Sequence, residues 1–456
     1  MKYVRHKVLS GLVLSLALLG ATRAFAQGLS FAGPGSKARS LGGAFTALAD
    51  DYSAIYWNPA GLAWTGRGTY GLSLDAAFPR GTMRLRTGSW PGGSAPDIQS
   101  RTSNGELSTG SAGAVFPVGR RFFLGLGVYS PVNTGTVWSG ADLAPLTANR
   151  SDIRWSGRLS VLTLAPVVAY KIDEQFSIGA SLTANYGRFA FSRYAGNFSA
   201  PLPEPPYFRE IDLGQYEESS TGWGFGATLG FSFRPSDRFS LGAVLRTATS
   251  ISFNGEASVE GFPALATALS RSIGRTSAIR KTIEWPVGLS LGLAGRPLEI
   301  LTLAVDFEWT RWSSLDAIDT VYQDPAWTSY MGERGNDHMP MFIRDTLRVR
   351  LGAEARLGAW AVRAGFFTDP SPAADDSINP FFPSRGALAA TLGVGFLFSS
   401  WKVDGFIEYR APRALSVGPT SMPVGPLSSR TIWDFQLPGQ YEGKALTVGF
   451  AVSRVF

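Results

Sequence analysis

The sequence predicts an all-β membrane protein, a transmembrane antiparallel β-barrel of about 14 strands with a small N-terminal helical hatch domain that plugs its lumen. First, about fourteen strand-like segments follow one another, and the links between them are by turns very short and long. Second, apolar and polar side chains alternate with a period of two, as in strands with one face in lipid. Third, no segment after the N-terminus offers 18 uninterrupted apolar residues, which excludes helical membrane spans.

Residues 1–26 are typical of a secretory signal peptide. A basic start precedes the apolar run Val8–Leu19 and the small-residue cleavage site Ala24-Phe25-Ala26. The apolar run is too short to span a bilayer. Cleavage would remove four basic residues and lower the net charge from +7 to +3, which does not favour a nucleic-acid partner. The chain has no cysteine, so it cannot form disulfides.

Residues 27–66 differ in composition from the rest of the chain and are predicted to form the hatch. They are rich in Gly and Ala, and they carry the acid pair Asp50-Asp51. Apolar residues recur there at the spacing of a helix, at Leu41, Ala44, Phe45 and Leu48. Pro59 moves Asn58 out of the helical region, so the NPAGL segment is expected to be a turn.

Residues 67–456 are predicted to form the barrel wall. An even number of strands is usual in bacterial single-chain barrels, and short periplasmic turns alternate there with longer outer loops. The sequence follows this alternation, with six links of one to four residues and seven long ones. The candidate strands are Arg67–Phe78, Gly110–Pro117, Arg121–Ser130, Gly157–Lys171, Phe176–Ser192, Ser220–Arg234, Arg238–Phe253, Ile283–Gly295, Glu299–Trp312, Arg344–Leu357, Ala359–Thr368, Gly386–Ser399, Trp401–Arg410 and Tyr441–Phe456.

Side-chain parity within these segments predicts a polar lumen. In Glu299–Trp312 the apolar residues share one face, whereas Asp306 and Glu308 share the other. An Arg or Lys that faces lipid near mid-bilayer costs about 2–4 kcal/mol, so charges confined to one parity should face inward. The arginines that we expect to face the lumen are Arg188, Arg246, Arg348 and Arg350.

No residue pattern points to catalysis or to a cofactor. His6 belongs to the signal, and His338 is expected in a solvated loop, so a Ser–His hydrolase would depend on that single histidine. No Cys or His cluster suggests a transition-metal site. The acid pairs lack the spacing of a calcium-binding loop. We therefore expect no enzyme activity, no cofactor and no metal.

The hatch sequence resembles the N-terminal signature of the outer-membrane long-chain fatty-acid transporter family (FadL/TodX type). The matching stretches are GGAFTALADD at 42–51 and AIYWNPAGL at 54–62. Wall segments 222–257, 285–314 and 362–396 also resemble family sequences. The resemblance implies a monomer in the outer membrane of a Gram-negative bacterium, surrounded by lipid and lipopolysaccharide. The C-terminal Phe456 resembles the signal that barrel-assembly machinery reads, although Arg454 departs from that pattern.

The resemblance further implies passive uptake of hydrophobic compounds, long-chain fatty acids first and aromatic hydrocarbons as an open alternative. In the family, ligand leaves the pore through a gap in the wall that an inward kink of the third strand opens, next to the NPA turn of the hatch. The corresponding gate residues here are Asn58, Pro59 and Ala60 in the turn, and Gly125 and Gly127 in the strand Arg121–Ser130. Alternatively, Asn58 only stabilises the hatch through an Asx-turn.

Two groups of residues are expected to bind ligand. The link 254–282 holds an apolar stripe at helical spacing that by position resembles the helical outer loop lining a first binding groove in the family; the stripe consists of Phe262, Leu265, Leu269 and Ile273. It could instead pack on neighbouring loops. The lumen arginines could bind a carboxylate bidentately, or they could form salt bridges with Asp306 and Glu308.

Two other transport-like functions stay open on the sequence alone. A PorV-like barrel, a scaffold or partner in protein secretion, would keep hatch and wall but bind a protein at its loops. A general porin would pass sugars through an open lumen. The predicted hatch, 40 residues long from 27 to 66, disfavours the general porin.

Overall fold

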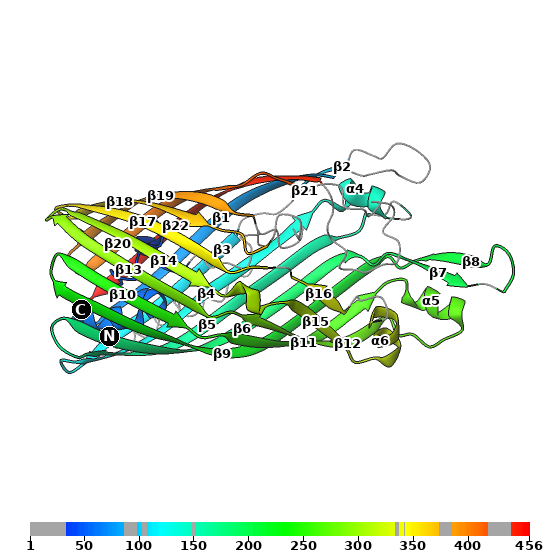
Figure 1. Ribbon diagram of the computed structural model, residues 1–456, viewed down its shortest axis with the longest axis horizontal. Coiled ribbons are helices and arrows are strands. Elements are labelled where there is room, and N and C mark those ends of the chain that lie inside the picture. The colour runs from blue at the N-terminus through cyan, green and yellow to red at the C-terminus, as the bar shows by residue number, and fades with distance from the viewer. Residues whose placement is uncertain are drawn as a thin grey trace, which may run out of the picture.

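The computed structural model describes residues 33–85, 98–102, 107–147, 149, 152–201, 203–332, 337–341, 343–373, 385–417 and 439–456. The predicted signal peptide and the first residues of the expected hatch lie outside the described residues. Tilted strands form a closed barrel, with short turns at one end and long loops and small helices at the other (Figure 1). Within the described ranges no helix is both long and apolar enough to cross a bilayer.

Fourteen antiparallel strands form the wall, which confirms the predicted fold class. We call each of them a stave, because three are interrupted and carry two strand labels. The barrel closes where β1 pairs along its whole length with β22, from Thr69↔Val455 to Leu85↔Gly439. Three staves are interrupted once, between β10 and β11, β12 and β13, and β14 and β15. The staves are β1(Thr69–Leu85), β3(Leu107–Val118), β4(Phe122–Trp138), β5(Trp155–Lys171), β6(Phe176–Tyr194), β9(Gln215–Ser236), β10(Phe239–Arg246) with β11(Thr249–Val259), β12(Thr276–Trp285) with β13(Gly288–Leu298), β14(Leu301–Thr310) with β15(Ala317–Tyr322), β17(Thr346–Leu357), β18(Trp360–Asp369), β19(Ala387–Phe398), β20(Trp401–Pro412) and β22(Gly439–Val455).

Apart from the three short helices of residues 33–66, the remaining elements belong to the long-loop end. They are the short strands β2(Ile98–Arg101), β7(Asn197–Pro201), β8(Phe208–Asp212), β16(His338–Pro340) and β21(Leu415–Val417), and the helices α4(Gly140–Leu143), η2(Ala144–Leu146), α5(Phe262–Leu269), η3(Trp312–Ser314) and α6(Pro325–Gly332). The hairpin of β7 and β8 extends beyond this end of the barrel (Figure 1).

Several staves continue further than the sequence predicted. The link expected at 254–282 is partly strand, because β11 runs to Val259 and β12 begins at Thr276. The two strands pair from Thr249↔Trp285 to Ser258↔Thr276. Backbone pairing satisfies hydrogen bonds whatever the side chains, so a ladder can continue above the membrane where the apolar alternation that marks a lipid-facing strand has ended.

The inner face of the wall is polar around the hatch but mainly apolar towards the loops, apart from polar groups such as the buried ion pair of Lys281 with Glu218; this corrects the prediction of a polar lumen. Towards the loops, large apolar side chains pack together on the inner face as one buried cluster; we call this apolar region the outer chamber, and its wall residues include Leu159, Val161, Phe189, Phe191, Phe253 and Ile283, all buried. In the outer part of β6 the usual alternation, with polar side chains inward and apolar side chains towards lipid, is reversed, because Phe189 faces inward. Arg188 is therefore exposed on the outer face together with Tyr186, and its predicted place in the lumen is wrong.

Candidate functional site: the hatch and the gap between β3 and β4

The described part of the predicted hatch, residues 33–66, is a compact, almost fully buried segment inside the short-turn end of the barrel (Figure 1). Its elements are α2(Ser36–Ser40), α3(Ala54–Trp57) and η1(Pro59–Trp64). The helix expected across Leu41–Leu48 is absent, because Gly42 and Gly43 take φ of 65° and 77°, where a right-handed helix cannot continue. Gly42 also lies against β18, where a Cβ on Gly365 would stand 2.1 Å from its backbone nitrogen.

Wall side chains bind the hatch backbone from several directions. On β14, Asp306 Oδ2 accepts hydrogen bonds from the backbone N–H groups of Phe45 (2.9 Å) and Thr46 (2.8 Å). Further bonds, each 2.9 Å long, are donated to hatch carbonyls by Ser177 to Ala60, Arg234 to Leu48, Arg246 to Tyr56 and Thr391 to Ser40. Buried carbonyls gain partners in this way, so the hatch is fastened at many points rather than loosely inserted.

Within the hatch, Lys37 and Asp50 form an ion pair of 2.5 Å between Nζ and Oδ1. Burial raises the pKa of Asp50, but the charge of Lys37 and its hydrogen bond lower it by more, so the pKa lies below its ordinary value. The carboxylate therefore stays ionised at neutral pH and holds the start of the hatch against its middle.

Asn58 is fully buried at the turn that precedes η1. Its Nδ2 donates to the carbonyl of Thr46 (2.8 Å) and to that of Phe231 on β9 (3.0 Å), while its Oδ1 accepts from Ala60 N (3.1 Å). The last bond is the Asx-turn, and the first two link hatch to hatch and hatch to wall. The turn lies against β6 and β9, where the glycines Gly179 and Gly230 leave room for Pro59 and Asn58.

Contact between the hatch and β4 comes from other residues. Gly125 and Gly127 accommodate Leu62 and Ile55, since a Cβ on Gly127 would stand 2.8 Å from Ile55 Cγ2. The ladder runs regularly through both glycines on either side. Their role in the structure is thus close packing of the hatch, and the irregularity of β4 lies further along.

That irregularity is a β-bulge at Ser130-Pro131. The pairing of β4 with β5 passes from Tyr129↔Thr163 to Val132↔Val161, so β4 carries one extra residue. Proline has no N–H to give to a ladder, and bulges are where sheets tolerate it. The prediction that this strand ends before Pro131 is wrong, because β4 continues to Trp138.

Beyond the bulge β4 parts from β3. The two strands pair from Val118↔Phe122 to Ser111↔Tyr129, and β3 then continues towards Leu107 paired only with β1. A side-chain bond from Asn133 Nδ2 to Ser108 O (3.1 Å) crosses this stretch, and Thr102 forms an isolated bridge with Trp138 at the end of β4. The wall therefore has a local gap between β3 and β4.

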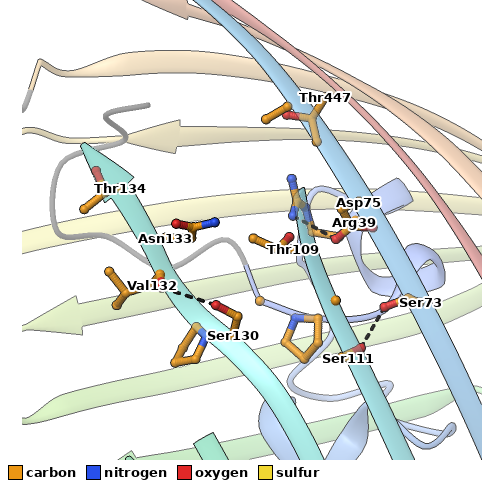
Figure 2. Close-up of a pocket in the computed structure, with 15 residues that line it drawn as sticks. Arg39, Ser73, Asp75, Thr109, Ser111, Ser130, Val132, Asn133, Thr134 and Thr447 are labelled. Atoms are coloured by element: carbon orange, nitrogen blue, oxygen red, sulfur yellow. Dashed lines mark hydrogen bonds and ion pairs between the residues drawn. The ribbon is translucent and has the colours of Figure 1, made fainter. Parts of the chain in front are cut away.

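A pocket occupies this gap (Figure 2). Its mouth is framed by residues of β3 and β4, and its inner end is formed by Pro34 and Arg39 of the hatch together with Ser73 and Asp75 of β1. In the view, Thr109 and Ser111 line one side, while Ser130, Val132, Asn133 and Thr134 line the other. The gap thus meets the hatch directly.

Three of the four predicted lumen arginines do face inward. Arg348 and Arg350 both bind Glu308, at 3.0 and 2.9 Å, and Arg348 also binds Asp369. Arg246 instead donates to the carbonyl of Tyr56 (2.9 Å) and to Ser290 Oγ (3.3 Å). Its guanidinium lies 4.8 Å from the ring centroid of Tyr56, which in turn stands edge-on to Tyr129 at 5.4 Å.

The apolar stripe of the outer loop faces the chamber rather than open solvent. α5 buries Phe262 and Leu265, and Phe262 packs edge-on against Trp327 of α6 with ring centroids 4.7 Å apart. Ile273 is buried too, and Leu269 packs at the edge of the same cluster. The stripe therefore helps to roof the outer chamber in this structure.

Sequence reasoning missed Arg39, whose ion pairs tie the hatch to the wall at the inner end of the pocket. Arg39 binds Glu408 on β20 at 2.9 Å and Asp75 on β1 at 3.5 Å. Strand alternation places Glu408 on the inner face between the exposed Ile407 and Tyr409, but it cannot indicate that a hatch residue pairs with Glu408. His338, on the loop strand β16, contacts Asp319 (2.6 Å) at the surface.

Comparisons with known proteins agree with this architecture. The sequence model of a family described as outer membrane protein transport protein (OMPP1/FadL/TodX) matches residues 17–456. A long-chain fatty acid transport protein of Escherichia coli is 21% identical over 416 residues, covering 86% of this chain and 87% of its own. A putative outer membrane protein of Neisseria meningitidis is 25% identical over 385 residues, covering 80% and 82%.

Solved structures show the same fold. A Pseudomonas aeruginosa FadL homologue superposes with a TM-score of 0.75 at 16% identity, covering 94% of this chain and 99% of its own. The P. putida toluene transporter TodX gives a TM-score of 0.69 at 15% identity, with the same coverage. Given the match over nearly the whole sequence and the shared barrel, this chain belongs to the OMPP1/FadL/TodX family of outer-membrane transport proteins for hydrophobic compounds.

Proposed function

We propose that this protein is a passive channel that takes up long-chain fatty acids through a lateral opening. A solute would enter the outer chamber from the loop end, descend to the hatch, and leave sideways through the gap between β3 and β4. An apolar chain that leaves laterally enters the membrane directly and avoids crossing a water-filled lumen. No energy source is required, because the solute moves down its gradient.

The observation that carries this proposal is the position of Val132. Its side chain belongs to the apolar cluster that lines the outer chamber, and the same residue lines the pocket in the gap. It is the first residue of β4 after the bulge that pairs again with β5. The chamber and the gap are therefore neighbours, and the bulge forms the border between them.

Arg246 supports a fatty acid as the main substrate. Its hydrogen-bond partners are a carbonyl and a hydroxyl, and no described carboxylate forms an ion pair with it, although Glu308 is near enough to interact with its charge; its guanidinium can therefore still bind a carboxylate ligand bidentately. Through Tyr56 it neighbours Tyr129, the last residue before the bulge. A fatty acid whose carboxylate is bound by Arg246 would thus have its head group near the gap. One relative is named for long-chain fatty acids and one for toluene, so aromatic hydrocarbons are the competing substrate class.

The test is uptake of labelled oleate and labelled toluene by cells that lack their own transporters of both classes. Cells that express this protein should take up oleate well above the empty-vector level. Toluene uptake without oleate uptake would replace fatty acids by aromatic hydrocarbons. If neither solute enters, and the purified protein passes sugars into liposomes, the lateral channel is wrong. A secreted protein that co-purifies in that case would indicate the scaffold function instead.

A further inference from the structure

The outer face of the wall carries exposed arginines 10 to 12 residues after the start of three strands. On β1, Phe78 is exposed towards lipid and Arg80, two residues later, is exposed on the same face. The same step from an exposed aromatic residue to an exposed arginine occurs at Tyr186 and Arg188 on β6, and at Trp309 and Arg311 after β14. All three strands run from the short-turn end towards the loops.

The height of Arg80 along the barrel axis follows from strand geometry. Tyr70, near the short turns, packs against Trp401 and Phe456, as expected for the periplasmic aromatic girdle. From Tyr70 to Arg80 the strand advances about 33 Å, which at a tilt of about 40° is about 25 Å along the barrel axis. That length equals the usual height of the apolar band. Arg80 therefore lies where the outer leaflet's head groups begin.

The exposed basic residues of the outer face are most closely spaced on β22, β1 and β2. Arg80 and Lys444 are direct cross-strand neighbours, and both side chains are exposed. Cβ atoms at such positions are about 5 Å apart, and like charges placed so destabilise a sheet. Arg84 and Arg101 are exposed nearby on the same face, where Glu442 is the one acidic side chain among the described residues of these three strands. Neither Arg80 nor Lys444 has an ion pair with any described carboxylate.

We propose that Arg80 and Lys444 bind a phosphate of the lipopolysaccharide lipid A in the outer leaflet, with Arg84 and Arg101 as flanking cations. A dianionic phosphate between two cations would turn their repulsion into charge-assisted hydrogen bonds. Directly below, Phe78 and Leu446 are exposed and can pack against the acyl chains of the same molecule. Arg188 and Arg311 would contact neighbouring glycolipids around the barrel. This binding is independent of solute transport.

The experiment is a titration of the purified full-length barrel in detergent with fluorescent bisphosphorylated lipid A. The test variant is Arg80→Gln/Lys444→Gln, and the matched control is Arg120→Gln/Arg238→Gln, which removes two exposed cations at the short-turn end. The test variant should bind at least about tenfold more weakly, while the control stays within about twofold of wild type. Because all four side chains are exposed, each variant should fold, which a heat-modifiability gel verifies.

Three results would overturn the proposal. Equal affinity of wild type and test variant would remove Arg80 and Lys444 from the site. Equal affinity of wild type for dephosphorylated lipid A would remove the phosphate. Competition by phosphatidylglycerol as strong as that by lipid A would mean that any anionic lipid satisfies the cations, so that no glycolipid site exists.

Discussion

At the scale of single residues, the side chain of Asn58 makes hydrogen bonds both within the hatch and to the wall. One amide side chain closes the Asx-turn, joins the two halves of the hatch through Thr46, and joins the hatch to β9 through Phe231. Asn58, Thr46 and Ala60 are buried, and the bond to Phe231 is partly buried, so losing the amide leaves the buried carbonyl of Thr46 without this donor.

Asn58→Ala should therefore loosen the hatch without unfolding the barrel. The buried carbonyl of Thr46 and the partly buried carbonyl of Phe231 each lose this donor, which costs about 1–3 kcal/mol of hatch docking. Hydrogen exchange of the hatch should rise, and oleate uptake should fall while the amount of folded barrel in the membrane stays the same. Asn254→Ala, at an exposed position on β11, is the control. Equal uptake by Asn58→Ala and wild type would remove Asn58 from the mechanism.

Arg246 allows the proposed substrate to be tested within one variant. Arg246→Gln removes the charge while keeping a donor for the carbonyl of Tyr56. Oleate uptake should fall by about tenfold, since a charge-assisted bond to the carboxylate is lost, while toluene uptake should not change. An equal fall for both solutes would mean that Arg246 only supports the hatch.

At the scale of elements, the decisive feature is the single extra residue in β4. The bulge at Ser130-Pro131 ends the ladder with β3, and the hatch packs against the regular part of the strand before it. The position of the gap is therefore set by the extra residue that β4 carries at the bulge. Gly125 and Gly127 of the same strand allow the hatch to pack closely.

Deleting Pro131 should restore an even register with β5 and let β4 continue its ladder with β3. Uptake of oleate should then drop towards the empty-vector level, although the barrel still folds. Pro131→Ala is the matched control, because it removes the ring but keeps the extra residue and hence the bulge. If the deletion variant transports as well as Pro131→Ala does, the bulge does not form the exit.

At the scale of the whole molecule, much of the fold could be predicted because lipid imposes simple rules. Period-two alternation, short and long links and strand number all follow from a wall with one apolar face, and the structure confirms the barrel they predict. Prediction failed where the rule no longer applies. In the outer chamber the inner face is apolar, so Arg188 was assigned to the wrong side of β6.

The site was less predictable than the fold, for a different reason. The NPA turn and the inward arginines could be located from motif and parity, but their partners are distant in sequence. Nothing local indicates that Arg39 pairs with Glu408, or that Asp306 holds the backbone of Phe45. The sequence predicts a strand end before Pro131, whereas the structure has a β-bulge there, where a sheet tolerates a proline that cannot donate to the ladder.

Closing the gap chemically tests the lateral exit most directly. The chain has no cysteine, so Thr109→Cys/Asn133→Cys introduces the sole pair of thiols, one on each side of the gap. Oleate uptake should be near wild type before treatment and should fall to the empty-vector level once a short bismaleimide has joined the two strands, while each single-cysteine variant keeps its uptake. Undiminished uptake through a fully cross-linked barrel would contradict the lateral exit.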